Sequence, residues 1–278
     1  MSASSRRPVI TLLTDYGTAD EFAGVLHGVI AMICPDARVI DLTHGIGRHD
    51  IRSGATILAQ SLRYLPVGVH LAVVDPTVGG DRRAVALRLA GGRILVGPDN
   101  GLLWPASQAG GGVEEAVEIS ESRWRREPVA ATFHGRDIFA PASAHLAAGE
   151  RFDQAGTPLD PALLIRLEEP RARTEGGVLV VTATNSDRYG NVQLGAGSED
   201  ISGLGVELGE NLRMRLPSGE ARQATYVVTF ADVAEGELIL FEDSNHMLAL
   251  GVNHGSALLR LGLRPGDQLR ISAARERP

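Results

Sequence analysis

The stretch VITLLTDYGTADEFAGVLHGVIAMICPDARVIDLTH, residues 9–44, decides the fold of the first half of this chain. It opens with a short apolar run that is typical of a buried strand. Apolar residues then recur at helical spacing over residues 22–33, and Thr18 or Asp20 is available as the helix N-cap. A second apolar run over residues 39–42 follows the helix. The stretch therefore predicts a strand–helix–strand unit.

The same alternation continues further along the chain. Residues 51–62 have a second helical face, and residues 69–74 form a third apolar run that leads directly into Asp75. Repeated alternation of strand and helix predicts a largely parallel sheet with helices on its faces. Ligands bind such sheets beyond the carboxyl ends of the strands. Asp15, His44 and Asp75 are each expected near such an end.

The second half of the chain has a different pattern. Residues 168–177 are charged and rich in helix breakers, as in a linker. Short β-type runs separated by turn residues then follow, at residues 178–183, 212–216, 225–230, 237–241 and 247–252. This pattern is typical of a small barrel or sandwich. We expect an α/β domain over residues 1–165, a linker over 166–177 and a β domain over 178–278.

Composition narrows the range of functions. The 278 residues carry a formal net charge of -7, and no lysine is present. An acidic chain without a basic stripe is a poor candidate for binding nucleic acid or an anionic membrane. Cys34 is the only cysteine, so no intramolecular disulfide can form, which fits a reducing compartment. No signal peptide or membrane span is visible, and we expect a cytoplasmic protein.

Several catalytic motifs are missing from the sequence. There is no G-x-G-x-x-G after a strand, no G-x-S-x-G, and no zinc-ligand spacing among the eight histidines. What remains is a set of polar residues near strand ends: Asp15, Asp75, Arg82 or its neighbour Arg83, and His134. Taken alone, each of these residues favours a structural interpretation, as a turn residue, a surface ion pair or a packed histidine.

The order of the motifs is more specific than any single residue. These strings occur in sequence: Thr14-Asp15-Tyr16-Gly17, Pro35-Asp36-Ala37, Asp41-Leu42-Thr43-His44, Val73-Val74-Asp75-Pro76, Gly97-Pro98-Asp99-Asn100-Gly101-Leu102-Leu103, Phe133-His134-Gly135-Arg136-Asp137 and Tyr189-Gly190-Asn191. Together they resemble the S-adenosyl-L-methionine hydroxide adenosyltransferase family, which also contains fluorinase and chlorinase enzymes. The resemblance extends over nearly the whole chain.

The resemblance implies an N-terminal α/β domain, a C-terminal β-barrel domain and a homotrimer with active sites at the subunit interfaces. In the hydrolytic branch an Asp-Arg-His set positions and activates water, and the matching positions here are Asp75, Arg82 and His134. Of these, His134 is suited to accept a proton near neutral pH. The halogenating branch typically has tyrosine at the position of Asp75, so Asp75 favours water over halide as the nucleophile.

The resemblance also implies the contacts to the substrate, S-adenosyl-L-methionine. Asp15 matches a ligand of the ribose hydroxyls, Asp20, Asp187 and Ser244 match contacts to methionine, Asn191 and Phe230 match contacts to adenine, and Asn245, Val252 and His254 lie where the family closes over the two ends of the substrate. No further cofactor and no metal are expected. The leaving group is a neutral thioether, so no metal is needed to stabilise an anion.

Two alternative functions stay open at this point. A halogenase would keep the fold and use chloride or another halide as the nucleophile. A non-catalytic module that binds adenosine or S-adenosyl-L-methionine stays open because the chain departs from the family pattern at positions that enclose the substrate, such as His49 and Asn245. Product analysis beside a binding measurement distinguishes all three functions.

Overall fold

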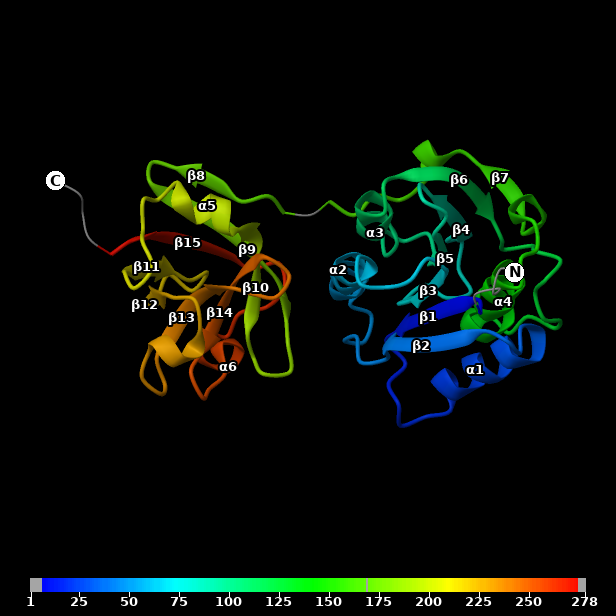
Figure 1. Ribbon diagram of the computed structural model, residues 1–278, viewed down its shortest axis with the longest axis horizontal. Helices are drawn as coiled ribbons and strands as arrows, with labels where there is room; N and C mark the ends of the chain where they lie inside the picture. The colour runs from blue at the N-terminus through cyan, green and yellow to red at the C-terminus, as the bar shows by residue number, and fades with distance from the viewer. Residues whose placement is uncertain (1–6, 169, 275–278) are drawn as a thin grey trace, which may run out of the picture. The chain divides into compact units, whose positions relative to one another are not determined.

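The computed structural model describes residues 7–168 and 170–274. The chain divides into two compact units, Met1–Glu168 and Glu169–Pro278. The first unit is built on a seven-stranded sheet and the second on an eight-stranded sheet (Figure 1). Within the segment expected to be linker, residues 173–175 form strand β8, which pairs with β9 of the second unit.

The N-terminal sheet has a parallel half and an antiparallel half. Its strands lie in the order β2 (Arg38–Thr43), β1 (Val9–Thr14), β3 (Val69–Val73), β5 (Ile94–Pro98), β4 (Ala84–Leu89), β6 (Val113–Glu118) and β7 (Thr157–Leu159). The pairs β1–β2, β1–β3 and β3–β5 are parallel, and the remaining pairs are antiparallel. The carboxyl ends of β1, β2 and β3 therefore share one edge, as the alternating pattern predicted.

Helices cover both faces of this sheet. Helices α1 (Phe22–Ile33) and α4 (Ala140–Ala147) pack on one face, and α2 (Ile51–Leu62) and α3 (Trp104–Ala109) on the other (Figure 1). Short helical turns lie at Gly135–Phe139 (η1), Phe152–Gln154 (η2) and Pro161–Leu163 (η3). The expected N-cap of α1 at Thr18 or Asp20 is wrong, because the helix begins after Glu21 and has no side-chain cap. The predicted α/β sandwich is confirmed.

The C-terminal unit is a closed β-barrel. Its sheet runs in the order β10 (Val192–Gly197), β14 (Met247–Val252), β13 (Leu238–Glu242), β12 (Ala221–Tyr226), β11 (Asn211–Arg215), β15 (Gln268–Ala273), β9 (Val178–Ser186) and β8 (Arg173–Glu175). Pairing of β10 with β9 closes the barrel around an apolar core. Helices α5 (Ser198–Ser202) and α6 (Ala257–Leu261) and the short turn η4 (Phe230–Asp232) lie between strands.

Most expected β runs of the second half correspond to strands, with one informative exception. The run expected over residues 225–230 is wrong at its end, because β12 stops at Tyr226 and Phe230 begins the turn η4. Asp232 holds that turn by accepting a hydrogen bond from the backbone N–H of Thr229 at 2.9 Å. Phe230 is therefore presented by a turn and not by a strand. None of the helices within residues 7–168 and 170–274 is long and apolar enough to cross a membrane.

Candidate active site

Asp75, Arg82 and His134 form one hydrogen-bonded cluster. The Arg82 guanidinium donates from Nε to Asp75 Oδ1 and Oδ2 at 3.1 and 3.0 Å, and from Nη2 to Oδ2 at 2.5 Å. The same Nη2 lies 2.8 Å from His134 Nδ1. The Asp75 and Arg82 side chains are only 5% and 7% exposed, so this ion pair is shielded from water. A buried, forked pair of this kind fixes the orientation of both groups.

The local backbone explains why Asp75 lies there. Asp75 comes two residues after the end of β3, and the side-chain amide of Asn100 donates to the Val74 carbonyl at 2.9 Å. The loop after Asp75 passes close to the segment before His134. A Cβ at Gly79, whose φ is +79°, would lie 2.3 Å from the Ala131 carbonyl oxygen. Glycine at this position therefore permits the approach that brings Arg82 to His134.

Geometry distinguishes Arg82 from its neighbour. Arg83 donates to Asp99 at 2.9 Å from Nε and 2.6 Å from Nη2, and to the Leu163 carbonyl at 2.6 Å. The side chains of Arg82 and Arg83 point in opposite directions, so that Arg82 pairs with the buried carboxylate of Asp75 and Arg83 with that of Asp99. Of the two arginines left open by the sequence, Arg82 is the one that contacts Asp75 and His134.

The surroundings of His134 favour its neutral form. Burial and the neighbouring Arg82 charge lower the pKa of His134 below its ordinary value, while Asp75 and Asp137 act in the opposite direction. Arg82 carries hydrogens on every nitrogen, so Nδ1 of His134 must be the acceptor of their contact. Neutral His134 therefore carries its own proton on Nε2.

Tyr16 belongs to this site, although the sequence analysis gave it no role. A Cβ at Gly135 would lie 2.3 Å from the Tyr16 hydroxyl oxygen, so the phenol reaches the backbone next to His134. Its ring packs against Phe22 and Phe133, with centroids 6.0 and 5.9 Å away. Burial, followed by the charges of Asp15 and Asp75, raises the pKa of Tyr16. Tyr16 therefore stays a neutral phenol beside two carboxylates.

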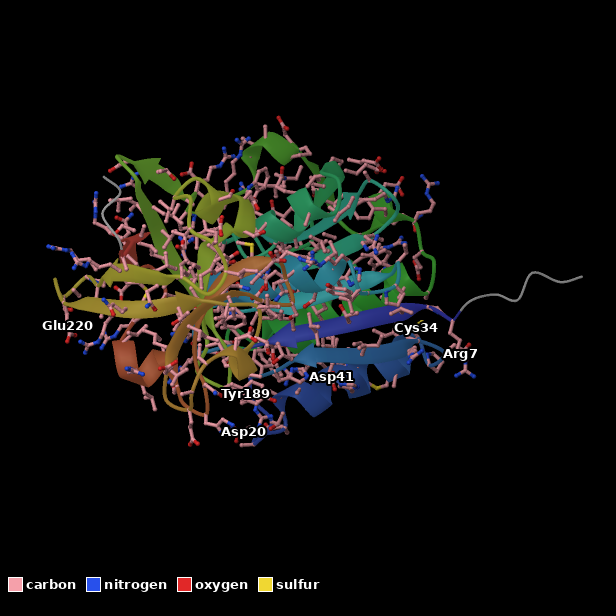
Figure 2. The ribbon with its side chains drawn as sticks, turned by 60° about the vertical axis from the view of Figure 1, so that its left-hand side comes forward. Arg7, Asp20, Cys34, Asp41, Tyr189 and Glu220 are labelled. Carbon is pink, nitrogen blue, oxygen red and sulfur yellow. The ribbon has the colours of Figure 1, made fainter. Side chains whose placement is uncertain are left out.

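Asp15 and Asp20 lie on the same connection between β1 and α1. The Asp15 backbone N–H reaches the Val73 carbonyl at 3.4 Å, which places Asp15 at the sheet edge that also carries Asp75. Its Oδ2 accepts a hydrogen bond from the His49 backbone N–H at 3.0 Å. Asp20 is exposed just before α1 (Figure 2). The Asp20 carboxylate is thus presented to solvent at the start of the helix.

In the C-terminal unit, Asp187 and Asn191 form a preorganised hairpin turn. Asp187 Oδ1 accepts hydrogen bonds from the backbone N–H groups of Tyr189 and Asn191, both at 2.9 Å, and Oδ2 accepts one from the Asn191 side chain at 2.7 Å. Most of the Asp187 acceptor capacity is therefore used to shape the turn. Tyr189, at its tip, is 71% exposed (Figure 2).

Asn191 and Phe230 lie around the same glycine. A Cβ at Gly251 would lie 3.0 Å from Asn191 Oδ1 and 2.8 Å from Phe230 Cε1. The Phe230 ring is half-buried and packs against Phe241 at 5.0 Å between centroids. The structure thus brings together an amide and an aromatic face, the two groups expected to contact adenine.

The remaining expected contacts lie at the two ends of β14. Ser244 and Asn245 are in the turn that precedes this strand, where the Asn245 N–H donates to Asp243 Oδ1 at 2.8 Å. Val252 ends the strand and His254, with φ of 55°, follows it. Antiparallel pairing of β10 with β14 puts the Asp187–Asn191 hairpin at the Val252 end. The structure therefore does not bring Asp187 and Ser244 to the same end of the strand.

Known proteins resemble the chain over both units. Residues 10–156 match the model of the SAM hydroxide adenosyltransferase N-terminal domain, and residues 182–270 match that of the C-terminal domain. A Salinispora tropica protein named (R)-S-adenosyl-L-methionine hydrolase is 48% identical over 96% of this chain and 98% of its own length. An Actinopolyspora mzabensis protein named fluorinase is 29% identical over 98% of this chain and 99% of its own.

A solved structure shares the fold. The crystal structure of an uncharacterized conserved protein from Thermotoga maritima has a TM-score of 0.87 and 31% sequence identity, covering 95% of this chain and 99% of that one. The agreement extends over both units, since so much of each chain is covered. This chain therefore shares its overall fold with a solved protein.

Proposed function

The chain belongs to the SAM hydroxide adenosyltransferase family, and on this premise we propose that it hydrolyses S-adenosyl-L-methionine to adenosine and L-methionine. The relatives with higher identity are named hydrolases of the (R) form, at 48% and 45%, whereas fluorinases match at about 29%. The (R) sulfonium epimer is accordingly the proposed substrate.

The single observation that carries this proposal is the buried Asp75–Arg82 pair, which Arg82 extends to His134. A carboxylate, a guanidinium and an imidazole in one shielded cluster can hold a water molecule, because the carboxylate accepts hydrogen bonds from it and the N–H groups donate hydrogen bonds to it. A bare halide has no hydrogen to donate, so the Asp75 carboxylate would repel it. The cluster therefore favours water as the nucleophile.

The reaction is an in-line displacement at the ribose C5′. A bond forms between the water oxygen and C5′, while the bond between C5′ and the sulfonium sulfur breaks and its electron pair returns to sulfur. Methionine leaves as a neutral thioether, so the substrate's positive charge passes to the protonated product oxygen. Its proton is then lost, which leaves adenosine. No metal is required by this balance.

Asp75 is the proposed acceptor of the water hydrogen. His134 was expected to accept it, but its Nδ1 is already the acceptor for Arg82, and its Nε2 carries a proton. Asp75 Oδ1 receives only the longer 3.1 Å bond from Arg82 Nε and retains acceptor capacity. Once the new bond to C5′ forms, the attached oxygen becomes strongly acidic, so a carboxylate suffices as the base. We assign His134 to orienting Arg82 and the water through Nε2–H.

The remaining expected residues would hold the substrate. Asp15 would accept hydrogen bonds from the ribose hydroxyls, and Asp20 would pair with the methionine ammonium. Asn191 and Phe230 would contact adenine, one by hydrogen bonding and the other by stacking. Asp187 would act chiefly by positioning Asn191, since its oxygens bind that turn. Ser244 and Asn245, at the far end of β14, would contact the methionine end, and Val252 and His254 the adenine end.

A homotrimer with active sites shared between subunits is part of the proposal, on the strength of the family resemblance. Light scattering of the purified protein should then give three times the chain mass. A cytoplasmic location is likewise proposed, supported by the single cysteine.

The decisive experiment is a product assay with each sulfonium epimer in ¹⁸O-labelled water, run in parallel with calorimetry of binding. We expect adenosine and methionine in equal amounts from the (R) epimer, with the label in the 5′-hydroxyl of adenosine, after chelator treatment and without added metal. Intact substrate despite measurable binding would show a non-catalytic module. A 5′-halo-5′-deoxyadenosine whose yield rises with halide concentration would show a halogenase.

A further inference from the structure

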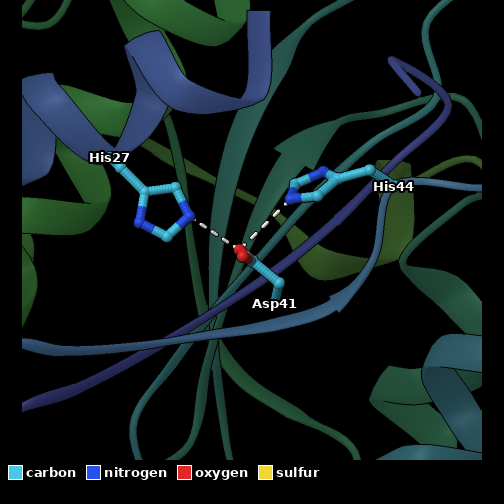
Figure 3. Close-up of side chains that lie close together, drawn as sticks. All are labelled: His27, Asp41 and His44. Atoms are coloured by element: carbon cyan, nitrogen blue, oxygen red, sulfur yellow. Dashed lines mark hydrogen bonds and ion pairs between the residues drawn. The ribbon is translucent and has the colours of Figure 1, made fainter. Parts of the chain in front are cut away.

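Three potential metal ligands converge in the N-terminal unit, apart from the Asp75–Arg82–His134 cluster. His27 on α1, Asp41 on β2 and His44 just after β2 each offer one ligand atom, and these atoms lie within 4.8 Å of one another. His27 Nε2 is 2.7 Å and His44 Nε2 is 3.1 Å from the same oxygen, Asp41 Oδ1 (Figure 3). No sequence motif indicates this group, because its members come from separate elements.

The spacing is close to that of a tetrahedral metal site. Zn²⁺ binds imidazole nitrogen and carboxylate oxygen at about 2.0–2.2 Å, which sets two ligand atoms about 3.3 Å apart in a tetrahedron. The two nitrogen–oxygen distances here are shorter than this, so these two pairs need to open by only a few tenths of an ångström. The two imidazole nitrogens lie within 4.8 Å of each other, so small side-chain rotations bring all three atoms to the spacing of a metal site. His27 and Asp41 have side-chain exposures of 37% and 46%, so a metal can enter and keep a water ligand.

His44 supplies an independent indication of a ligand. Its side chain is only 5% exposed, and its Nε2 points toward Asp41. Within the described parts of the chain, this buried nitrogen has no well-directed hydrogen-bond partner. Its other ring nitrogen, Nδ1, lies 2.8 Å from Thr14 Oγ1. Metal-binding histidines typically have this second contact, which fixes the ring and leaves the opposite nitrogen for the metal.

Other histidines of the chain provide a useful contrast. His145 pairs with Glu150 at 3.0 Å, and His246 pairs with Glu242 at 2.7 Å. These are ordinary two-group contacts, and neither pair belongs to a group of three potential ligands among the described residues. Two imidazoles and one carboxylate select zinc or a similar transition metal over magnesium or calcium, which prefer oxygen ligands.

We propose that His27, Asp41 and His44 form a binding site for one divalent transition-metal ion of the zinc type, with water as a fourth ligand. The ion tethers α1 to the end of β2 and thereby stabilises the N-terminal unit. It also acts next to the substrate-binding connection, because Thr14 Oγ1 receives the Tyr16 N–H at 3.1 Å and the His44 carbonyl receives the Gly17 N–H at 2.8 Å. The site is separate from the hydrolytic cluster and does not depend on the proposed activity.

The test is calorimetric titration of chelator-stripped, tag-free protein with Zn²⁺ alone, combined with metal analysis after dialysis. We expect one equivalent of Zn²⁺ and a higher melting temperature, because a ligand that binds only the folded state stabilises it. His27→Gln should weaken Zn²⁺ binding by at least about 100-fold. Loss of a group that only holds a metal-binding side chain in place already lowers metal affinity by about 10–100-fold. Mg²⁺ should not bind at this site.

His27→Gln is also the matched folding control, because the glutamine amide can still donate to Asp41. Its metal-free melting temperature should therefore equal that of the wild type, and Zn²⁺ should no longer raise it. His246→Gln removes an exposed histidine of a two-group pair and should bind Zn²⁺ as the wild type does. Absence of stoichiometric Zn²⁺ in the wild type, or equal affinity in His27→Gln, would overturn the proposal.

Discussion

Asp75 and Arg82 of the N-terminal unit are almost fully buried, whereas Asp187, Ser244 and His254 of the C-terminal unit are exposed. The first group is held by side chains that contact each other, and the second is presented on turns between strands. Chemistry on a bound substrate requires groups that are oriented before reaction, in surroundings that exclude water. Contacts to the ends of a ligand tolerate exposure. Under the proposed function, the chemistry lies in the N-terminal unit, and the C-terminal unit supplies contacts to the substrate.

The largest expected effect comes from Asp75→Asn. The substitution removes the proposed acceptor of the water hydrogen and leaves Arg82 without its carboxylate. We expect kcat to fall by about 10³-fold, within the range usual for loss of a general base. Substrate affinity should change little, because Asp75 is assigned to the water and not to the nucleoside. Steady-state kinetics together with calorimetric substrate binding measures both quantities.

Asp99→Asn is the matched control for this substitution. It breaks the neighbouring Arg83–Asp99 pair, whose carboxylate is similarly buried at 4% exposure. Both variants lose a buried ion-pair partner and should be destabilised, so activity is normalised to the folded fraction. Only Asp75→Asn should then lose turnover. Equal losses of kcat in both variants would mean that the Asp75 pair is merely structural.

Much of this contrast could be predicted from the sequence. Hydrophobic periodicity indicates the parallel strands, and the family resemblance carried by the ordered motifs points to Asp75, His134 and one of the two adjacent arginines. Which arginine contacts Asp75 could not be read from adjacent positions, since neighbouring residues point in opposite directions. The end of β12 was also missed by the sequence analysis. The segment before Phe230 has a strand-like composition, but the Thr229–Asp232 hydrogen bond turns the chain away.

Other features depend on contacts between distant segments. Asn100 holds the backbone before Asp75, and Tyr16 reaches Gly135, which lies more than a hundred residues later in the chain. No local pattern encodes such approaches. The His27–Asp41–His44 group is hidden in the same way, because a helix and a strand end must pack together before it exists. These contacts between distant residues can be identified only once the fold is known.

The two units should differ in how their stability responds to acid. His70 on β3 is fully buried, and burial, with the nearby Arg93 charge, lowers its pKa to about 4. The unfolded chain takes up a proton at His70 near pH 6.5, whereas the folded chain does not until about pH 4. The stability that the fold gains from keeping His70 neutral is therefore fully present above pH 6.5. As the pH falls toward 4, the free energy of unfolding decreases by about 3 kcal/mol on account of this group. Both histidines of the C-terminal unit are exposed.

Urea unfolding at pH 7 and pH 4.5 measures this difference. Both tryptophans, Trp104 and Trp124, lie in the N-terminal unit, so their fluorescence reports that unit, while circular dichroism reports both. The combined variant Thr11→Val, His70→Leu removes the titrating ring together with the hydroxyl that contacts it at 3.0 Å. Its fluorescence transition should lose less stability in acid than that of the wild type. An unchanged acid loss would rule out His70 as the cause.

The smallest expected effect tests recognition by the C-terminal unit. Phe230→Ala removes the aromatic face beside Asn191 and Gly251, and stacking of a base on such a ring contributes about 1–3 kcal/mol. The dissociation constant for substrate should therefore rise about tenfold or more, with kcat within about twofold of the wild type. Phe230→Tyr keeps the ring and should restore affinity. A fall in kcat at unchanged affinity would instead place Phe230 in catalysis. The turn that presents Phe230 would then serve the chemistry that is proposed for the buried Asp75–Arg82–His134 cluster, and the two units would not have separate roles.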